Sequence, residues 1–258
     1  MRVTTDGFVL TDGDFRVLDE DDFGVPGLVA HEWVGPFVEV QALGPLIMVH
    51  DGIFDPRKGI THHPHRYNER LFYILEGAVE HDDALNDIQG FMGTGDLGRL
   101  TEGVRGMLHQ EWNVTDARAR AFILVYSTDP VPARASFEAL RDADAPRYED
   151  APGVKTKEIA GPRAGLPLFG DIRLFTDSAL DPGAELPVEL GAEEGGLLFP
   201  LEGSLAFESE VLAPEAMALL PPAAEPRSLR ARAEEGARVL RATFGPGHGL
   251  VLRSRRRA

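Results

Sequence analysis

Residues 62–81, HHPHRYNERLFYILEGAVEH, decide the fold of this chain. Residues 71–75 form an apolar and aromatic run of strand type, which closes on a Glu-Gly pair before a second apolar segment begins. This pattern predicts two strands joined by a hairpin or a bend. Further apolar runs occur at residues 46–49 and 121–126, with Gly and Pro turns between them and no sustained helical periodicity. Many short strands with such turns predict an all-β sandwich or barrel.

Histidines accompany this strand pattern in two groups. Residues two apart in a strand point to the same face, so His63 pairs with His65, and His109 pairs with Glu111. Two such strands side by side would bring four ligands to one point. Three imidazoles and a carboxylate suit a divalent first-row metal, whereas a structural zinc site normally includes thiolates, and the chain has no cysteine. We therefore predict a metal site made of His63, His65, His109 and Glu111.

Glu69 is an alternative carboxylate ligand. If the strand is unbroken, Glu69 has the same parity as His63 and His65 and points to the same face. Glu69 can then replace Glu111 or supplement it. Loss of metal from Glu69→Ala but not from Glu111→Ala would decide in its favour.

Other ionisable residues near these segments have simpler interpretations. His62 points to the face opposite the ligand pair, so we expect it at the surface or beside the ligands. His81 follows the turn in an acidic run, and we interpret it as a solvated strand end. His50 and Asp51 lie on a neighbouring predicted strand, from which they can approach the pocket.

The ordered set of motifs resembles the first cupin domain of the pirin family. The motifs are HPHR at residues 63–66, YILEG at 73–77, VEH at 79–81, GD at 95–96 and HQE at 109–111. Residues 43–48 and 146–149 also resemble pirin segments, so the resemblance covers most of the chain. It implies two tandem cupin β-barrels of jelly-roll type, joined by a short, partly helical linker. It also implies a single non-haem metal in the first barrel, held by HxH and HxE, which favours Glu111 over Glu69.

The second half of the chain repeats the first in outline. Its LLFPLEG at residues 197–203 matches LFYILEG at 71–77, which suggests a duplicated domain. Superposing the two Leu-Glu-Gly triplets places Glu189 and Gly191 where the first copy has His63 and His65, so we expect no metal in the second copy.

The composition changes after the first barrel and sets the predicted domain limits. We predict a first cupin domain with the metal over residues 1–130, a linker over 131–157, and a degenerate cupin domain over 158–258. Within the linker, residues 136–141 are predicted to form a short helix.

Charge and hydropathy exclude several classes of protein. A net charge of −16 disfavours direct nucleic-acid binding, and we interpret the basic residues 253–257 as a solvated tail. No apolar run has the length of a membrane span, and the N-terminus lacks a signal-peptide layout, so we expect no membrane association and a cytoplasmic location.

Two classes of function remain. The resemblance implies a quercetin 2,3-dioxygenase-like enzyme that uses one divalent metal, Fe(II) by preference or else Mn, Ni, Cu or Zn, and that acts on an aromatic small molecule with O2. Four ligands on a six-coordinate ion leave two open positions for them. Glu111 would be the catalytic residue that accepts a substrate proton, on the expectation that a dry pocket raises its pKa. The alternative is a non-enzymatic, redox-sensitive metal-binding regulator that acts through a protein partner.

Overall fold

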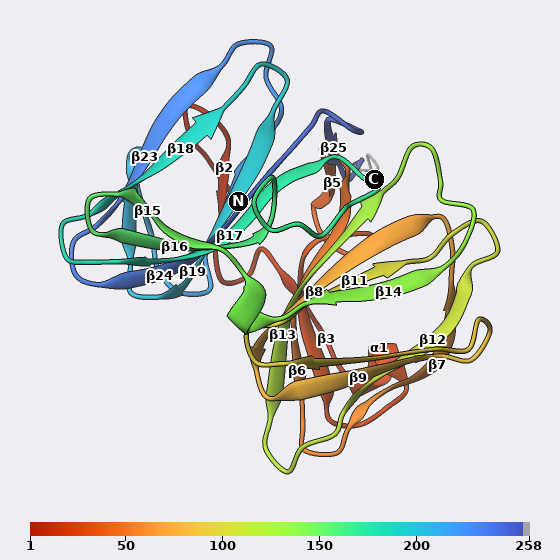
Figure 1. The fold of residues 1–258 in the computed structure, drawn as a ribbon. Coiled ribbons are helices and arrows are strands. Elements are labelled where there is room, and N and C mark those ends of the chain that lie inside the picture. Colours follow the sequence, from red (N-terminus) through yellow and green to blue (C-terminus); the bar gives the residue numbers. More distant parts are fainter. Residues whose placement is uncertain (255–258) are drawn as a thin grey trace.

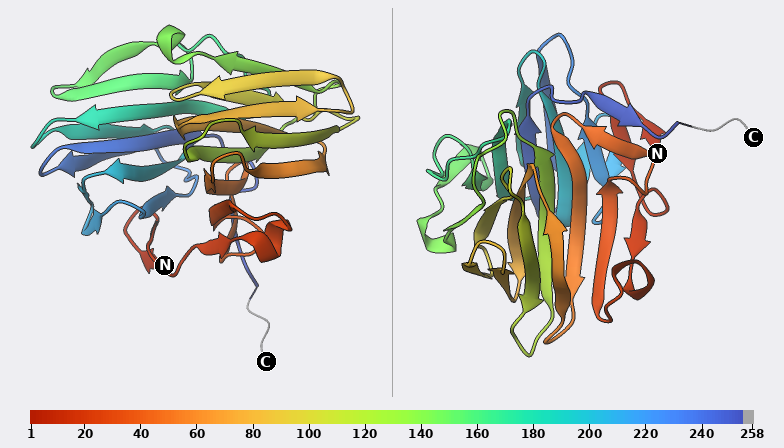
Figure 2. Two further views of the ribbon diagram at one scale, coloured as in Figure 1. Left: turned by 90° about the horizontal axis from the view of Figure 1, so that it is seen from below. Right: turned by 90° about the vertical axis from the view of Figure 1, so that its right-hand side faces the viewer.

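The computed structural model describes residues 1–254, and their secondary structure is almost entirely β. The helical elements of this range are α1 (Glu20–Phe23) and η1 (Asp142–Asp144). Each half of the chain forms a sandwich of one large sheet and one four-stranded sheet, and the two sandwiches lie side by side (Figures 1 and 2). The predicted class, an all-β protein with two tandem cupin units of jelly-roll type, is confirmed.

The first half contributes two antiparallel sheets that face each other. The large sheet has the spatial order β14 (Ser136–Leu140), β11 (Leu97–Thr101), β8 (Asn68–Glu76), β13 (Ala119–Ser127), β6 (Leu46–Phe54), β4 (Leu28–Val34) and β3 (Arg16–Leu18), with β25 (Leu250–Leu252) and β5 (Val40–Leu43) attached beside β6. The smaller sheet has the order β10 (Ile88–Gly93), β9 (Ala78–Asp83), β12 (Met107–Asn113) and β7 (Gly59–His65).

The second half repeats this pair of sheets. Its large sheet has the order β1 (Arg2–Val3), β2 (Phe8–Leu10), β22 (Met217–Leu220), β19 (Gly195–Glu202), β24 (Ala237–Phe244), β17 (Ile172–Leu180), β16 (Val154–Ala160) and β15 (Arg147–Ala151). Its smaller sheet has the order β18 (Glu185–Leu190), β23 (Arg227–Ala233), β20 (Leu205–Phe207) and β21 (Glu210–Leu212).

Residues 71–75 of strand β8 are all apolar or aromatic because both faces of the strand are covered. Phe72 and Ile74 belong to the core between the two sheets of the first half, whereas Leu71 and Tyr73 belong to a second core shared with the other half. Gly77 makes the turn into β9 with a φ of 71°, and a Cβ there would lie 2.9 Å from that of Ala119. The predicted hairpin is therefore present, with glycine required at its turn.

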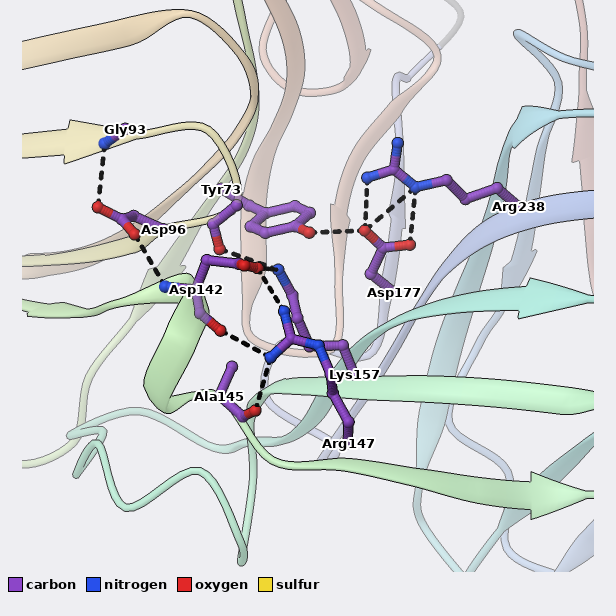
Figure 3. A network of polar contacts seen from close by, with 10 residues as sticks. Tyr73, Gly93, Asp96, Asp142, Ala145, Arg147, Lys157, Asp177 and Arg238 are labelled. Atoms are coloured by element: carbon purple, nitrogen blue, oxygen red, sulfur yellow. Dashed lines mark hydrogen bonds and ion pairs between the residues drawn. The ribbon is translucent and has the colours of Figure 1, made fainter.

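Polar contacts join the two halves beside the shared core. The hydroxyl of Tyr73 on β8 donates to Asp177 on β17 at 2.6 Å, and Arg238 on β24 donates to the same carboxylate at 2.7 Å (Figure 3). Close by, Lys157 donates to the Gly95 carbonyl at 3.0 Å and to Asp142 at 2.6 Å. The two sandwiches are thus fixed to each other by apolar packing and by charged hydrogen bonds.

The predicted helix at residues 136–141 is wrong. Residues 136–140 form β14, which pairs with β11 along its whole length, because the exposed edge of the large sheet offers hydrogen bonds that outweigh helical propensity. Helical structure near the linker is confined to η1, and β15 already belongs to the sheet of the second half. The limits 1–130, 131–157 and 158–258 stay a prediction.

Terminal strands cross between the halves. Near the N-terminus, β1 and β2 extend the sheet of the second half through β22, while β25 near the C-terminus pairs with β5 in the first half (Figure 1). None of the helices in residues 1–254 is long and apolar enough to cross a membrane.

Candidate metal centre

The two ligand motifs lie on adjacent strands of the smaller sheet in the first half. Strand β7 carries His63 and His65, and it pairs antiparallel with β12, which places His109 directly opposite His63. A register shift after His109 puts Glu111 opposite Ile60. The predicted juxtaposition of the two strands is therefore present, with a bulge that moves the carboxylate relative to the imidazoles.

Three imidazoles converge. The ring centroids lie 4.8 Å apart for His63 and His65, 4.5 Å for His63 and His109, and 5.0 Å for His65 and His109. One nitrogen of each ring lies within 4.8 Å of the others. Nδ1 of His63 donates to the Thr61 carbonyl at 2.8 Å, which leaves Nε2 with its lone pair free. This geometry suits a shared cation.

The surroundings of His109 indicate whether these residues suit a metal ion. Its side chain is fully buried; Nδ1 lies 2.7 Å from Oε1 of Glu111, whereas Nε2 has no hydrogen-bond partner among the described residues. Buried polar atoms without partners are rare in proteins, because each forfeits its interaction with water. A metal ion bound by one nitrogen would supply the missing interaction, so the donor set fits a divalent transition metal.

Glu111 lies beside His109 and also contacts a histidine from a third strand. Its Oε1 lies 2.7 Å from Nδ1 of His109 and 3.0 Å from Nδ1 of His81. His81, His109 and Glu111 form a second compact group that shares His109 with the first. Burial by itself would raise the pKa of Glu111, but the charge of His109 and hydrogen bonds from both histidines hold it well below its usual range. The expectation of a raised pKa is wrong, because these histidines outweigh desolvation.

His81 is buried, not a solvated strand end as predicted. On β9 it stands opposite Glu111, and its ring stacks on Phe137 of β14 with centroids 5.4 Å apart. Its parity with the apolar Val79 was the sequence signal for this burial, since residues two apart share a face. The acidic residues that follow concealed the signal.

Glu69 lies outside the metal site. Strand β7 ends at His65 and β8 begins at Asn68, with Tyr67 at a φ of 83° between them, so parity does not carry from one strand to the other. The Glu69 carboxylate is fully buried toward the second half. It accepts hydrogen bonds from Tyr126 at 2.6 Å, Thr101 at 2.6 Å and the Phe169 amide at 2.9 Å.

A cavity of about 210 Å³ opens beside the ligands. His63, His65 and Glu111 line it, and most of the remaining wall is apolar: Phe23, Leu28, Ala30, Met48, Phe54, Ile60, Phe72 and Ile123. His50 reaches this wall, as the sequence suggested, and its Nε2 lies 3.0 Å from a Glu32 carboxylate oxygen.

Two further residues considered from the sequence point away from the cavity. Asp51 pairs with Arg120 at 2.7 Å. His62 faces outward and lies 2.8 Å from Asp82. The alternation of strand faces thus separates these side chains from the ligands.

The imidazoles of β7 are held in the uncharged form. Desolvation, with the charge of Arg70 second, lowers the pKa of His65 to about 2. Desolvation and the charge of His109 lower the pKa of His63. Neutral imidazole is the form that binds metal ions, so both rings are ready to do so at neutral pH.

The second half has no counterpart of this group within residues 1–254. Glu189 on β18 is exposed and accepts a hydrogen bond from Ser228 at 2.7 Å. Gly191 has no side chain to offer.

Comparison with known proteins agrees with this fold and site. The family model for pirin matches residues 23–125. A protein of Pseudomonas aeruginosa named "Putative quercetin 2,3-dioxygenase PA3240" is 31% identical over 208 residues, which cover 75% of this chain and 71% of that protein. The chain belongs to the pirin family. This pirin is also 30% identical to Pirin-like protein 2 of Arabidopsis thaliana over 57% of its own length, and the match spans only 46% of the plant protein.

A solved structure shows the same architecture. Bacterial pirin YhhW from Escherichia coli, in complex with nickel(II), superposes with a TM-score of 0.70 over 90% of this chain and 99% of YhhW, at 17% sequence identity. At this identity the likeness establishes a shared fold and leaves the chemistry to be argued from the residues.

Proposed function

We propose that this pirin is a metal-dependent dioxygenase similar to quercetin 2,3-dioxygenase, acting on a flavonol or a similar chelating aromatic with O2. The observation that carries the proposal is the convergence of His63, His65 and His109 beside an apolar cavity, with Nε2 of the buried His109 unpartnered in the described structure. The name of the Pseudomonas relative supports the same reaction class.

The ligand set would be His63, His65, His109 and Glu111. Fe(II) is the preferred ion on this proposal, with Mn, Ni, Cu and Zn as alternatives. When bound, such an ion supplies Lewis-acid chemistry toward chelating oxygens and, if redox-active, reactivity toward dioxygen.

The protein's own groups would position the substrate and receive its proton. Phe54 and Phe72 provide apolar walls that exclude water from the bound ring. Glu111 is held ionised, the form that accepts a phenolic or enolic proton, and His81 fixes the direction of its carboxylate through the 3.0 Å hydrogen bond. A depressed pKa makes Glu111 a weak base, so substrate binding must favour the transfer.

The test joins metal analysis to an oxygen assay. Wild-type protein is compared with the His63→Ala/His109→Ala variant by elemental analysis, then loaded anaerobically with Fe(II) and assayed with quercetin in an oxygen electrode. We expect about one metal per chain in the wild type, none in the variant, and oxygen uptake with wild type alone. His248→Ala is the matched control, because that histidine lies in the second half, outside both compact groups.

The outcomes separate the two classes of function. Metal binding without oxygen uptake would favour the regulator that acts through a protein partner. Absence of metal from wild-type protein would refute the site itself.

A further inference from the structure

Arg70 is a charged residue in the wall of the metal cavity. It lies on β8 two residues before Phe72, so both side chains point to the same face, and both line the cavity beside His63 and His65. Arg70 is buried, with 7% of its surface exposed. A buried guanidinium inside a mostly apolar cavity requires a reason.

One edge of this guanidinium is held by the protein. Nε of Arg70 donates a hydrogen bond to Oε1 of Glu102 at 2.8 Å. Oε2 of Glu102 accepts a hydrogen bond from the backbone N–H of Asn68 at 3.0 Å. Glu102 is fully buried, so the pair is shielded from water. This contact fixes the orientation of the guanidinium plane.

The other edge is free. Neither Nη atom of Arg70 donates to any residue in the described part of the chain. The planar fork of an arginine matches the two oxygens of a carboxylate, and such bidentate, charge-assisted pairs are among the strongest hydrogen bonds in proteins. The free edge therefore offers an anion the donors that the protein itself leaves unused.

The guanidinium of Arg70 lines the same cavity as His63 and His65, and most of the remaining wall is apolar. Few groups in this wall compete for its unused N–H donors. An anionic group on a substrate would enter a favourable potential.

We propose that Arg70 binds a carboxylate of the substrate, so that among chelating aromatics the site prefers a compact aromatic acid to a neutral polycyclic flavonol. The size of the cavity agrees, because about 210 Å³ lies below the usual range of small-molecule sites and suits a single ring. This inference rests on the proposed function, since it names the substrate class of the same site.

The experiment compares two chelating probes that differ by one carboxylate. Zn(II)-loaded protein is titrated calorimetrically with 3,4-dihydroxybenzoate and with catechol. Wild type should bind the acid more tightly by about ten- to a hundredfold, and Arg70→Met should lose that preference while keeping its affinity for catechol. Arg70→Lys should retain only part of it, because lysine keeps the charge without the fork.

Two further variants serve as controls for this experiment. Arg66→Met removes the same charge from an exposed residue next to His65, outside the cavity wall, and should keep the preference. Arg70→Met combined with Glu102→Gln avoids leaving a buried carboxylate without its partner, so it serves if the single variant does not fold. Bound zinc is measured in every sample and should be equal.

Equal affinity of wild type for the two probes, or an equal loss in Arg66→Met, would overturn the inference. A preference that depends on Arg70 without oxygen uptake would uphold it while the dioxygenase proposal fails. If the protein binds no metal, the titration with 3,4-dihydroxybenzoate is repeated on metal-free protein. Wild type and Arg70→Met must then differ in affinity, or the role of Arg70 is refuted.

Discussion

Nδ1 of His81 lies 3.0 Å from Oε1 of Glu111, across the strand pair formed by β9 and β12. The two residues face each other in register, and the hydrogen bond holds the carboxylate beside His109. His81 is thus placed to orient a metal ligand from outside the ligand set, as residues that support metal ligands commonly do.

His81→Ala should weaken metal binding about ten- to a hundredfold without abolishing it, because Glu111 remains but loses its orienting bond. Competition with a chromophoric chelator measures the dissociation constant. His62→Ala is the control, since that ring faces outward and contacts Asp82. An equal loss in His62→Ala would show that the effect is not specific to His81.

Glu69→Gln should destabilise the protein and leave its metal content unchanged. The Glu69 carboxylate accepts three buried hydrogen bonds at the junction of the two halves. Weakening this charged network should cost about 1.5–3 kcal/mol of unfolding free energy. Denaturant unfolding and elemental analysis test both parts, and Glu111→Gln should give the reverse pattern. Loss of metal from Glu69→Gln would contradict the placement described above.

Metal-free protein should lose stability as pH falls below about 6.5. Desolvation and the charge of Arg70 lower the pKa of folded His65 from 6.5 to about 2, so the unfolded chain binds more protons throughout that window. Glu111 acts in the same direction at lower pH, since its folded pKa is also lowered.

Calorimetry in the presence of a chelator, between about pH 5 and pH 7.5, measures this dependence. His65→Ala should flatten the curve, whereas His248→Ala should leave it unchanged. A His65→Ala curve parallel to that of the wild type would refute the assignment.

Tyr73→Phe should loosen the junction between the halves. It removes the 2.6 Å hydrogen bond to Asp177 but keeps the ring in the shared core (Figure 3). We expect a loss of about 1.5–3 kcal/mol, seen as a lower midpoint in thermal unfolding. Tyr148→Phe is the matched control, because its hydroxyl lies 3.4 Å from Glu158 and should contribute less. Equal effects of the two variants would argue against the Asp177 contact.

The sequence predicted what depends on local alternation. The apolar runs of β8 and β13 indicate strands that are covered on both faces, and the pairing of HxH with HxE follows from a period of two residues. The helix expected at 136–141 failed because an available sheet edge outweighed local propensity. Glu69 was an alternative ligand only if the strand continued from His65, and the backbone break at Tyr67 removes that condition.

The role of Arg70 could not be predicted from local sequence patterns. Arg70 lies between Glu69 and an apolar run, and only the fold brings Glu102 to one edge of its guanidinium and the cavity to the other. The pairing of each terminal strand with the opposite half of the chain could not be predicted from local patterns either. Pairing between residues more than two hundred positions apart leaves no periodic trace in a sequence.

That crossing determines how the chain responds to cleavage. The connection at residues 141–146 lies outside the regular strands and joins β14 of the first sandwich to β15 of the second. A protease cut there would leave the first fragment holding β1 and β2, which complete the sheet of the second, while the second fragment keeps β25, which pairs with the first. The nicked protein should therefore migrate as one particle and separate only when denatured, and neither sandwich can be excised intact as a contiguous piece.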